Sequence, residues 1–182
     1  MRPFLIGIGG AHSKVGKTTI ACHILNRLSG WGAIKYTKTS FYSSIIDSPE
    51  ILRQENKDTS RLINAGAQDV LWVQSPLEDL QEVLQIAIDR LSYLTGIIIE
   101  GNGAIEVIKP DIVVFVSANK NLKSGSEKVL RMADAVIFDK DLPEETPKTA
   151  TKLHINNEED YINFIMRRLR FKTRKRHNSE HL

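Results

Sequence analysis

One short stretch near the start of the chain combines the residue types that bind phosphate. Residues 11 to 18 read Ala-His-Ser-Lys-Val-Gly-Lys-Thr, and a second threonine follows. In such a loop, backbone N–H groups converge on an anion at a helix N-terminus, and the glycine permits close approach of the backbone. Lys17 would reach the β- and γ-phosphates, and Thr18 would offer a hydroxyl to Mg²⁺. The predicted nucleotide-binding residues here are Ala11, His12, Ser13, Lys14, Val15, Gly16, Lys17, Thr18 and Thr19.

The elements that must position this loop are short apolar runs separated by helical patterns. The expected strands are residues 4–8, 33–36, 70–74, 97–100, 112–117 and 135–138. The clearest helical pattern is an apolar stripe with three- and four-residue spacing, formed by Leu77, Leu80, Leu84, Ala87, Leu91 and Leu94. Strands that alternate with helices predict right-handed crossovers and a mostly parallel sheet. We therefore expect an α/β fold of three layers, with helices on both faces of the sheet.

Carboxylates that follow the strands are candidates for the metal site, because ligands bind beyond the carboxyl ends of parallel strands. Glu100 would hold Mg²⁺ through water or orient an attacking water, so Lys17 and Glu100 are the predicted catalytic residues. Asp47 follows the second strand and is a third candidate metal ligand, with an exposed surface carboxylate as the alternative. Lys35, Lys57 and Asp58 could recognise a second substrate or its phosphate, and Asp58 could equally be a helix N-cap.

The phosphate loop resembles the Walker A motif of P-loop NTPases, with alanine at its first position. The segments "IKYT" (34–37), "KDTSR" (57–61) and "AGA" (65–67), with Glu100-Gly101, resemble the molybdopterin-guanine dinucleotide biosynthesis protein B family of the SIMIBI class. The resemblance covers roughly residues 4 to 140. It implies a P-loop NTPase fold and a small homodimeric GTPase that hydrolyses GTP slowly and helps to attach a nucleotide to molybdopterin. Molybdopterin, or a protein that handles it, would be the partner.

Related metal-centre maturation GTPases offer a second comparison. In them an Asn-Lys-x-Asp motif reads guanine, and here Asp139-Lys140-Asp141-Leu142 stands at that position. Asp139 and Lys140 are therefore the predicted base contacts, with GTP favoured and ATP an open alternative. An ATP-dependent ligase or kinase related to dethiobiotin synthetase is a further possibility. The sequence has neither the Cys-Pro motif nor the histidine-rich tract of nickel-delivering members, so we expect no transition-metal role.

Composition and charge set the remaining expectations. The 182 residues suit one domain, expected at 1–170, and the single cysteine favours a reducing, cytoplasmic setting. Residues 167–182 hold seven of the 25 Lys and Arg residues but one of the 22 Asp and Glu residues. A basic tail at 171–182 is therefore expected to be solvated and disordered, although it could touch nucleic acid or an acidic surface. A nucleic-acid partner is not the favoured interpretation, and we expect no membrane contact.

Overall fold

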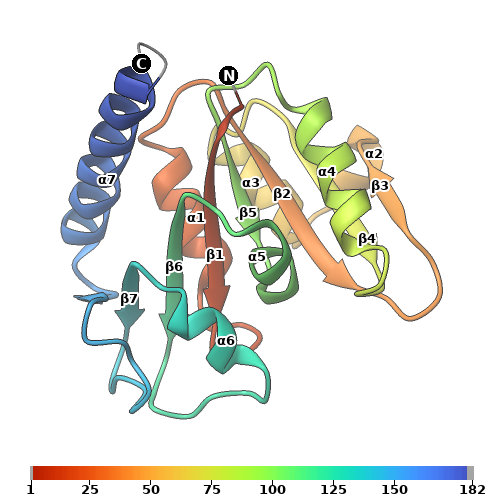
Figure 1. Ribbon diagram of the computed structural model, residues 1–182. Coiled ribbons are helices and arrows are strands. Elements are labelled where there is room, and N and C mark those ends of the chain that lie inside the picture. Colours follow the sequence, from red (N-terminus) through yellow and green to blue (C-terminus); the bar gives the residue numbers. More distant parts are fainter. Residues whose placement is uncertain (1, 180–182) are drawn as a thin grey trace.

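The computed structural model describes residues 2–179, which form a central sheet covered by helices on both faces (Figure 1). The strands run in the order β3-β4-β2-β5-β1-β6-β7-β8 across the sheet. β3 is antiparallel to β4, and the other neighbours pair in parallel. The strands are β1 (Phe4–Gly10), β2 (Trp31–Lys38), β3 (Ser44–Ile46), β4 (Val70–Ser75), β5 (Gly96–Glu100), β6 (Ile112–Ser117), β7 (Ala135–Phe138) and β8 (Thr151–His154). The predicted α/β architecture is confirmed.

The helices form two layers, and alternate residues of each central strand face one or the other. Ile98 of β5 packs in the cluster that includes α1, α3 and α7, whereas Ile97 and Ile99 pack in the cluster beneath α4 and α5. α6 packs beside α5 on that second face. The helices are α1 (Lys17–Leu25), α2 (Pro49–Leu52), α3 (Asp58–Asn64), α4 (Leu80–Arg90), α5 (Asn102–Ile108), α6 (Ser126–Arg131) and α7 (Glu158–Ser179). This alternation explains why the central strands read as continuous apolar runs.

All six predicted strands are present, but two edge strands were not predicted. β3 and β8 are short and contain no fully buried residue, so they lack the apolar runs that identified the others. The helix is shorter than the predicted apolar stripe, because α4 ends at Arg90 and Leu91 and Leu94 are buried just after it. Leu80, Leu84 and Ala87 are buried on α4, whereas Leu77 precedes the helix and is 48% exposed. Leu77 follows Pro76, and the helix begins only after that turn.

The C-terminal segment differs from its prediction. Residues 171–179 continue helix α7, whereas the sequence predicted a disordered tail from 171; residues 180–182 lie outside the described part of the chain. Tyr161, Ile165 and Leu169 are buried at four-residue spacing and anchor the helix to the sheet. Lys and Arg are good helix formers, so the helix extends beyond this anchor despite its charge.

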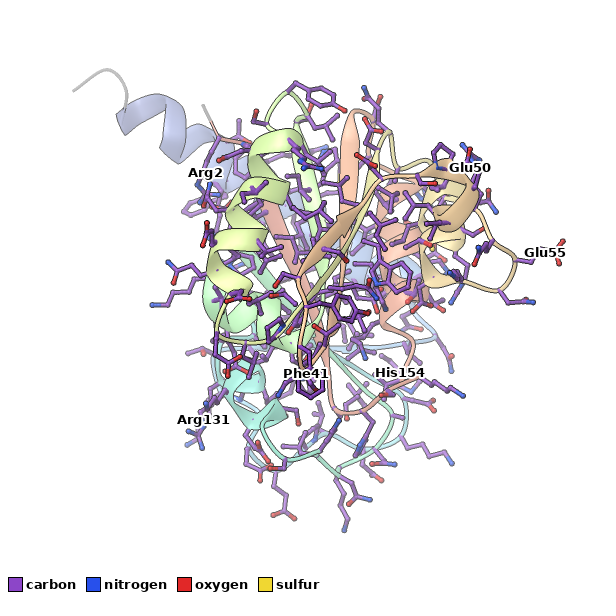
Figure 2. All side chains as sticks on the ribbon, turned by 90° about the vertical axis from the view of Figure 1, so that its right-hand side faces the viewer. Arg2, Phe41, Glu50, Glu55, Arg131 and His154 are labelled. Carbon is purple, nitrogen blue, oxygen red and sulfur yellow. The ribbon has the colours of Figure 1, made fainter. Side chains whose placement is uncertain are left out.

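The loop between β2 and β3 carries the most exposed aromatic side chain among the large apolar residues described. Phe41 is 97% exposed and stands on this loop, while Glu50 lies on α2, farther along the same edge of the molecule (Figure 2).

Within residues 2–179, no helix has both the length and the apolar character needed to span a lipid bilayer.

Candidate functional site

The loop between β1 and α1 has the backbone conformation of an anion-binding turn. Lys14 has a φ of 61° and Gly16 a φ of 97°, so both lie in the left-handed region. Gly16 precedes the first residue of α1 and its carbonyl accepts the first intrahelical hydrogen bond, from Ile20 N at 3.0 Å. A Cβ at Gly16 would make only an ordinary van der Waals contact, 3.6 Å from Ile155 Cδ1. Glycine is therefore favoured there by backbone conformation rather than by crowding.

Residues outside the motif hold the loop in place. The Asn102 side chain accepts from Gly10 N at 2.9 Å and donates to Gly10 O at 3.0 Å, which fixes the end of β1 against the start of α5. Ala11 O accepts from Lys123 N at 3.0 Å, and a His12 ring nitrogen lies 2.9 Å from Asn121 O. These anchors leave no local signal in the sequence, because each joins positions about a hundred residues apart.

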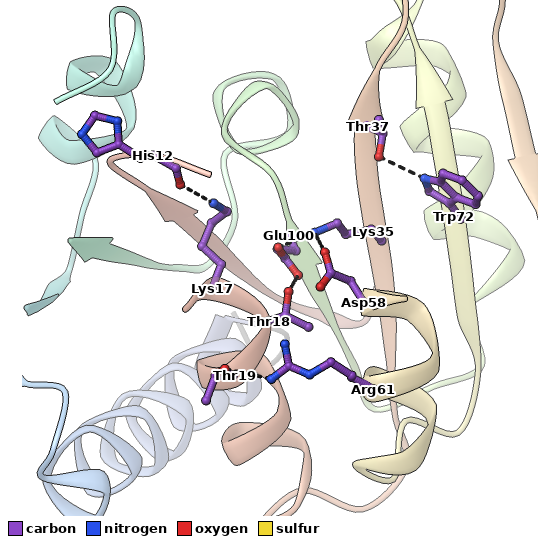
Figure 3. A network of polar contacts seen from close by, with 10 residues as sticks. All are labelled: His12, Lys17, Thr18, Thr19, Lys35, Thr37, Asp58, Arg61, Trp72 and Glu100. Atoms are coloured by element: carbon purple, nitrogen blue, oxygen red, sulfur yellow. Dashed lines mark hydrogen bonds and ion pairs between the residues drawn. The ribbon is translucent and has the colours of Figure 1, made fainter. Parts of the chain in front are cut away.

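Lys17 points back across its own loop. Its Nζ donates to His12 O at 2.8 Å (Figure 3). Burial lowers the pKa of Lys17, while the charge of Glu100 acts in the opposite direction. The ammonium therefore lies inside the loop on a neutral carbonyl, which a phosphate oxygen could replace with a stronger charge-assisted hydrogen bond.

Thr18, Glu100, Lys35 and Asp58 form one hydrogen-bonded chain beneath the loop (Figure 3). Thr18 Oγ1 donates to Glu100 Oε2 at 2.9 Å. Lys35 Nζ donates to Glu100 Oε1 at 2.5 Å and to Asp58 Oδ2 at 2.6 Å. Lys35 on β2 and Glu100 on β5 are direct partners in the parallel register, and both face the layer of α1 and α3. The sheet thus brings together residues predicted from separate segments.

The charges of these side chains offset the burial of the contacts, in which the Glu100 side chain is 2% exposed. Burial alone would lower the pKa of Lys35, but the carboxylates of Glu100 and Asp58 outweigh it and raise this pKa above its ordinary value. Partial burial would raise the pKa of Asp58, but Lys35 outweighs it and the pKa lies below its ordinary value. One ammonium therefore serves two carboxylates.

These groups open on a pocket of about 490 Å³. Arg61 also reaches it from α3 and donates to Thr19 Oγ1 at 2.8 Å. The pocket is lined by Ser13, Lys14, Gly16, Lys17, Thr18, Thr19, Lys35, Tyr36, Thr37, Asp58, Arg61 and Glu100. A hydroxyl and a carboxylate 2.9 Å apart are hard oxygen donors of the kind that Mg²⁺ takes alongside waters and phosphates. Within residues 2–179, no group of three or more His, Cys, Asp or Glu side chains could hold a metal ion by itself.

Asp47 does not lie in this site, contrary to the prediction. It follows β3, which runs antiparallel to β4, so the chain moves away from the carboxyl ends of the parallel strands as it approaches Asp47. Asp47 is instead 3.7 Å from Arg90 at the end of α4, with 70% of its side chain exposed. The sequence placed Asp47 after the second predicted strand, at 33–36, and did not predict the reversed strand β3 that lies between them.

Asp139 and Lys140 follow the carboxyl end of β7, and the phosphate loop follows the carboxyl end of β1, at the same end of the parallel strands. Their backbone N–H groups donate to Ser117 O at 3.1 Å and to Ala118 O at 3.2 Å. These bonds tie the two residues to the end of β6, the strand that pairs with β1. A role for Asp139 and Lys140 in base recognition stays a prediction.

Solved structures that share the fold of this chain include two HypB proteins. HypB from Helicobacter pylori, solved in complex with nickel, has 16% sequence identity and a TM-score of 0.57 over 93% of this chain and 88% of that protein. The hydrogenase maturation factor HypB from Archaeoglobus fulgidus has 13% identity and a TM-score of 0.59, over 90% and 89%. The chain has a P-loop NTPase fold. No protein-family model matches this P-loop chain, and no curated protein sequence does so either.

Proposed function

We propose that this chain binds a nucleoside triphosphate with Mg²⁺ and hydrolyses it slowly. The observation that carries the proposal is that Lys17, Thr18 and Glu100 line one pocket. The pocket lies beneath the loop in which Lys14 and Gly16 have left-handed backbone conformations. Glu100 ends β5, and Lys17 and Thr18 begin α1, so the fold places a buried carboxylate beside a lysine and a threonine hydroxyl. A triphosphate would supply the negative charge that this arrangement of N–H groups and ammonium groups favours.

The chain's own residues divide the work of binding. The loop amides and Lys17 hold the β- and γ-phosphates, and Lys17 exchanges the His12 carbonyl for a phosphate oxygen. Arg61 reaches from α3 to Thr19 at the start of α1, where it neutralises charge on the phosphates nearest that helix. Thr18 and Glu100 would hold Mg²⁺, which when bound neutralises the charge of the β- and γ-phosphates.

Slow hydrolysis follows from the contacts of Glu100. Both of its oxygens already accept hydrogen bonds, one from Thr18 and one from Lys35. A carboxylate held in this way can orient a water, but both of its oxygens are already engaged, so it is poorly placed to act as a general base. We propose Asp58 as the second carboxylate of the site, because it lines the pocket and shares Lys35 with Glu100.

GTP is the favoured nucleotide, with Asp139 and Lys140 as the residues that contact the base. Thermal unfolding with Mg²⁺ and either GTP or ATP tests this choice. We expect GTP to raise the melting temperature more than ATP, and Asp139→Ala to remove the difference while leaving Mg²⁺-triphosphate binding in place. An equal shift with both nucleotides would contradict the base assignment without touching the phosphate site.

The finer proposal is a role in attaching a nucleotide to molybdopterin, as a homodimer. It is supported by the segments 34–37 and 57–61, which carry the family resemblance and contribute Lys35 and Asp58 to the same site. Adding the protein and GTP to a reconstituted synthesis of the guanine dinucleotide should raise its yield. An unchanged yield of the dinucleotide would contradict this role. Analytical ultracentrifugation that gives the mass of a monomer would contradict the homodimer.

A metal-centre maturation role is the second candidate, supported by the fold shared with two HypB proteins. Titration of the purified chain with nickel would test it. Micromolar nickel binding that changes the affinity for GTP would favour this candidate over the molybdopterin role, and unchanged GTP affinity with nickel present would count against it.

A further inference from the structure

A second pocket lies beside the phosphate site, on the far side of Lys35 and Asp58. It has a volume of about 320 Å³, at the lower end of the range for small-ligand sites. It lies between the carboxyl end of β2, the start of α3 and β4, and is lined by Lys35, Thr37, Asn56, Lys57, Asp58, Thr59 and Trp72. The proposed nucleotide site uses Lys35 and Asp58 but neither Trp72 nor Lys57, which the sequence offers as a contact for a second substrate.

The wall of this pocket presents an indole ring and an ammonium group together. Trp72 Nε1 donates to Thr37 Oγ1 at 3.0 Å, which fixes the plane of the ring (Figure 3). Lys57 Nζ lies 4.9 Å from the centre of the same ring. Within the described chain, no carboxylate lies within ion-pair distance of Lys57. A cation–π contact at a partly exposed site is weak, so a ligand can displace the ammonium from the ring.

The two pockets share one wall. Lys35, Thr37 and Asp58 line both of them. Lys35 donates to Glu100, and Thr18 donates to the other oxygen of Glu100. These two contacts connect the second pocket to Thr18, beside which the terminal phosphate is expected. A molecule bound against Trp72 would therefore lie next to the triphosphate rather than at a remote surface.

We infer that this pocket binds a small molecule with a flat conjugated ring and an anionic group, with the ring stacked on Trp72 and the anion paired with Lys57. That this molecule is the second substrate of the chain rests on the proposed nucleotide site. Stacking on an indole and pairing with a cation supply the two interactions that such a ligand needs. Lys35 cannot supply the pairing charge, because Glu100 and Asp58 already hold it.

Isothermal titration with pyridoxine 5′-phosphate tests the inference, since this probe combines a flat heteroaromatic ring with a phosphate. Pyridoxine is the ring without the anion, and inorganic phosphate is the anion without the ring. We expect the parent to bind pyridoxine 5′-phosphate at least about tenfold more tightly than either. Trp72→Leu and Lys57→Gln should each weaken this binding about tenfold. Lys148→Gln, at an exposed lysine outside both pockets, should leave it unchanged.

Two further measurements separate this inference from the nucleotide site. Lys17→Ala should keep its affinity for pyridoxine 5′-phosphate, which shows that the probe does not lie in the phosphate loop. Trp72→Leu and Lys57→Gln should keep the melting-temperature rise produced by Mg²⁺ and GTP, which shows that they are folded. Binding lost in Lys17→Ala, unchanged in Trp72→Leu and Lys57→Gln, or no tighter than that of pyridoxine would overturn the inference. A parent that binds the probe but no nucleotide would overturn only the proposed function.

Discussion

The pairing of Lys35 with Glu100 makes a quantitative prediction about stability. Lys35→Met removes the ammonium and leaves the carboxylate of Glu100, which is 2% exposed, with Thr18 as its remaining recorded side-chain donor. Removal of one partner from a buried ion pair costs about 3–5 kcal/mol. Asp58 is 43% exposed, so water can solvate it once Lys35 is gone. We therefore expect the lower end, about 3 kcal/mol.

Thermal unfolding measures this cost directly. For a chain of this size, about 3 kcal/mol corresponds to a fall of about 6–12 °C in the melting temperature. The double variant Lys35→Met/Glu100→Gln should recover at least about 1 kcal/mol of this loss, because it no longer buries an unpaired charge. A decrease of less than about 2 °C in the melting temperature of Lys35→Met would refute the assignment of a buried ion pair. A double variant less stable than Lys35→Met would refute it as well.

The pH dependence of the same variant has a defined sign. The pKa of Lys35 is raised above 10.5 in the fold, so its contribution is complete below that value and is lost as the pH rises through the raised pKa. The pKa of Asp58 is lowered below 3.8, so its contribution is present above that value and is lost as the pH falls through the lowered pKa. The stability difference between parent and variant should be largest between these limits and shrink outside them.

Three further predictions concern the site. Thr18→Val should abolish the extra melting-temperature rise that Mg²⁺ gives with GTP, whereas Thr18→Ser should keep it, since only the hydroxyl is required. Asn102→Ala leaves Gly10 N–H and C=O unpaired and should cost about 1–3 kcal/mol in chemical denaturation; stability equal to that of the parent would contradict the anchor. Asp47→Asn should change the Mg²⁺-GTP affinity by less than about twofold, because its partner is exposed Arg90; a larger loss would restore Asp47 to the metal site.

The phosphate loop and the central strands can be predicted from the sequence because each depends on the types of neighbouring residues. A buried strand between two helical layers reads as an apolar run, and a loop motif keeps its meaning wherever the fold places it. The same reasoning names Glu100, Lys35 and Asp58 separately. Their contacts follow from the parallel register of β2 with β5, which no local pattern encodes.

The errors have the same origin. Asp47 was assigned by its distance from the second strand, and the reversal of β3 carries it away. The anchor from Asn102 to Gly10 joins β1 to α5 across more than ninety residues, so neither partner shows its role in the sequence. The helix at 171–179 depends on its continuity with the buried residues Tyr161, Ile165 and Leu169, which a composition argument about charge does not consider.

Titration of GTP with Mg²⁺ into the parent and into Lys17→Ala tests the central claim most directly. Lys148→Ala, which removes an exposed lysine elsewhere, is the matched control. The account predicts that the parent and the control bind GTP equally, and that Lys17→Ala binds at least about a hundredfold more weakly while its melting temperature without nucleotide stays near that of the parent. GTP bound equally well by Lys17→Ala would show that the loop between β1 and α1 is not the phosphate site.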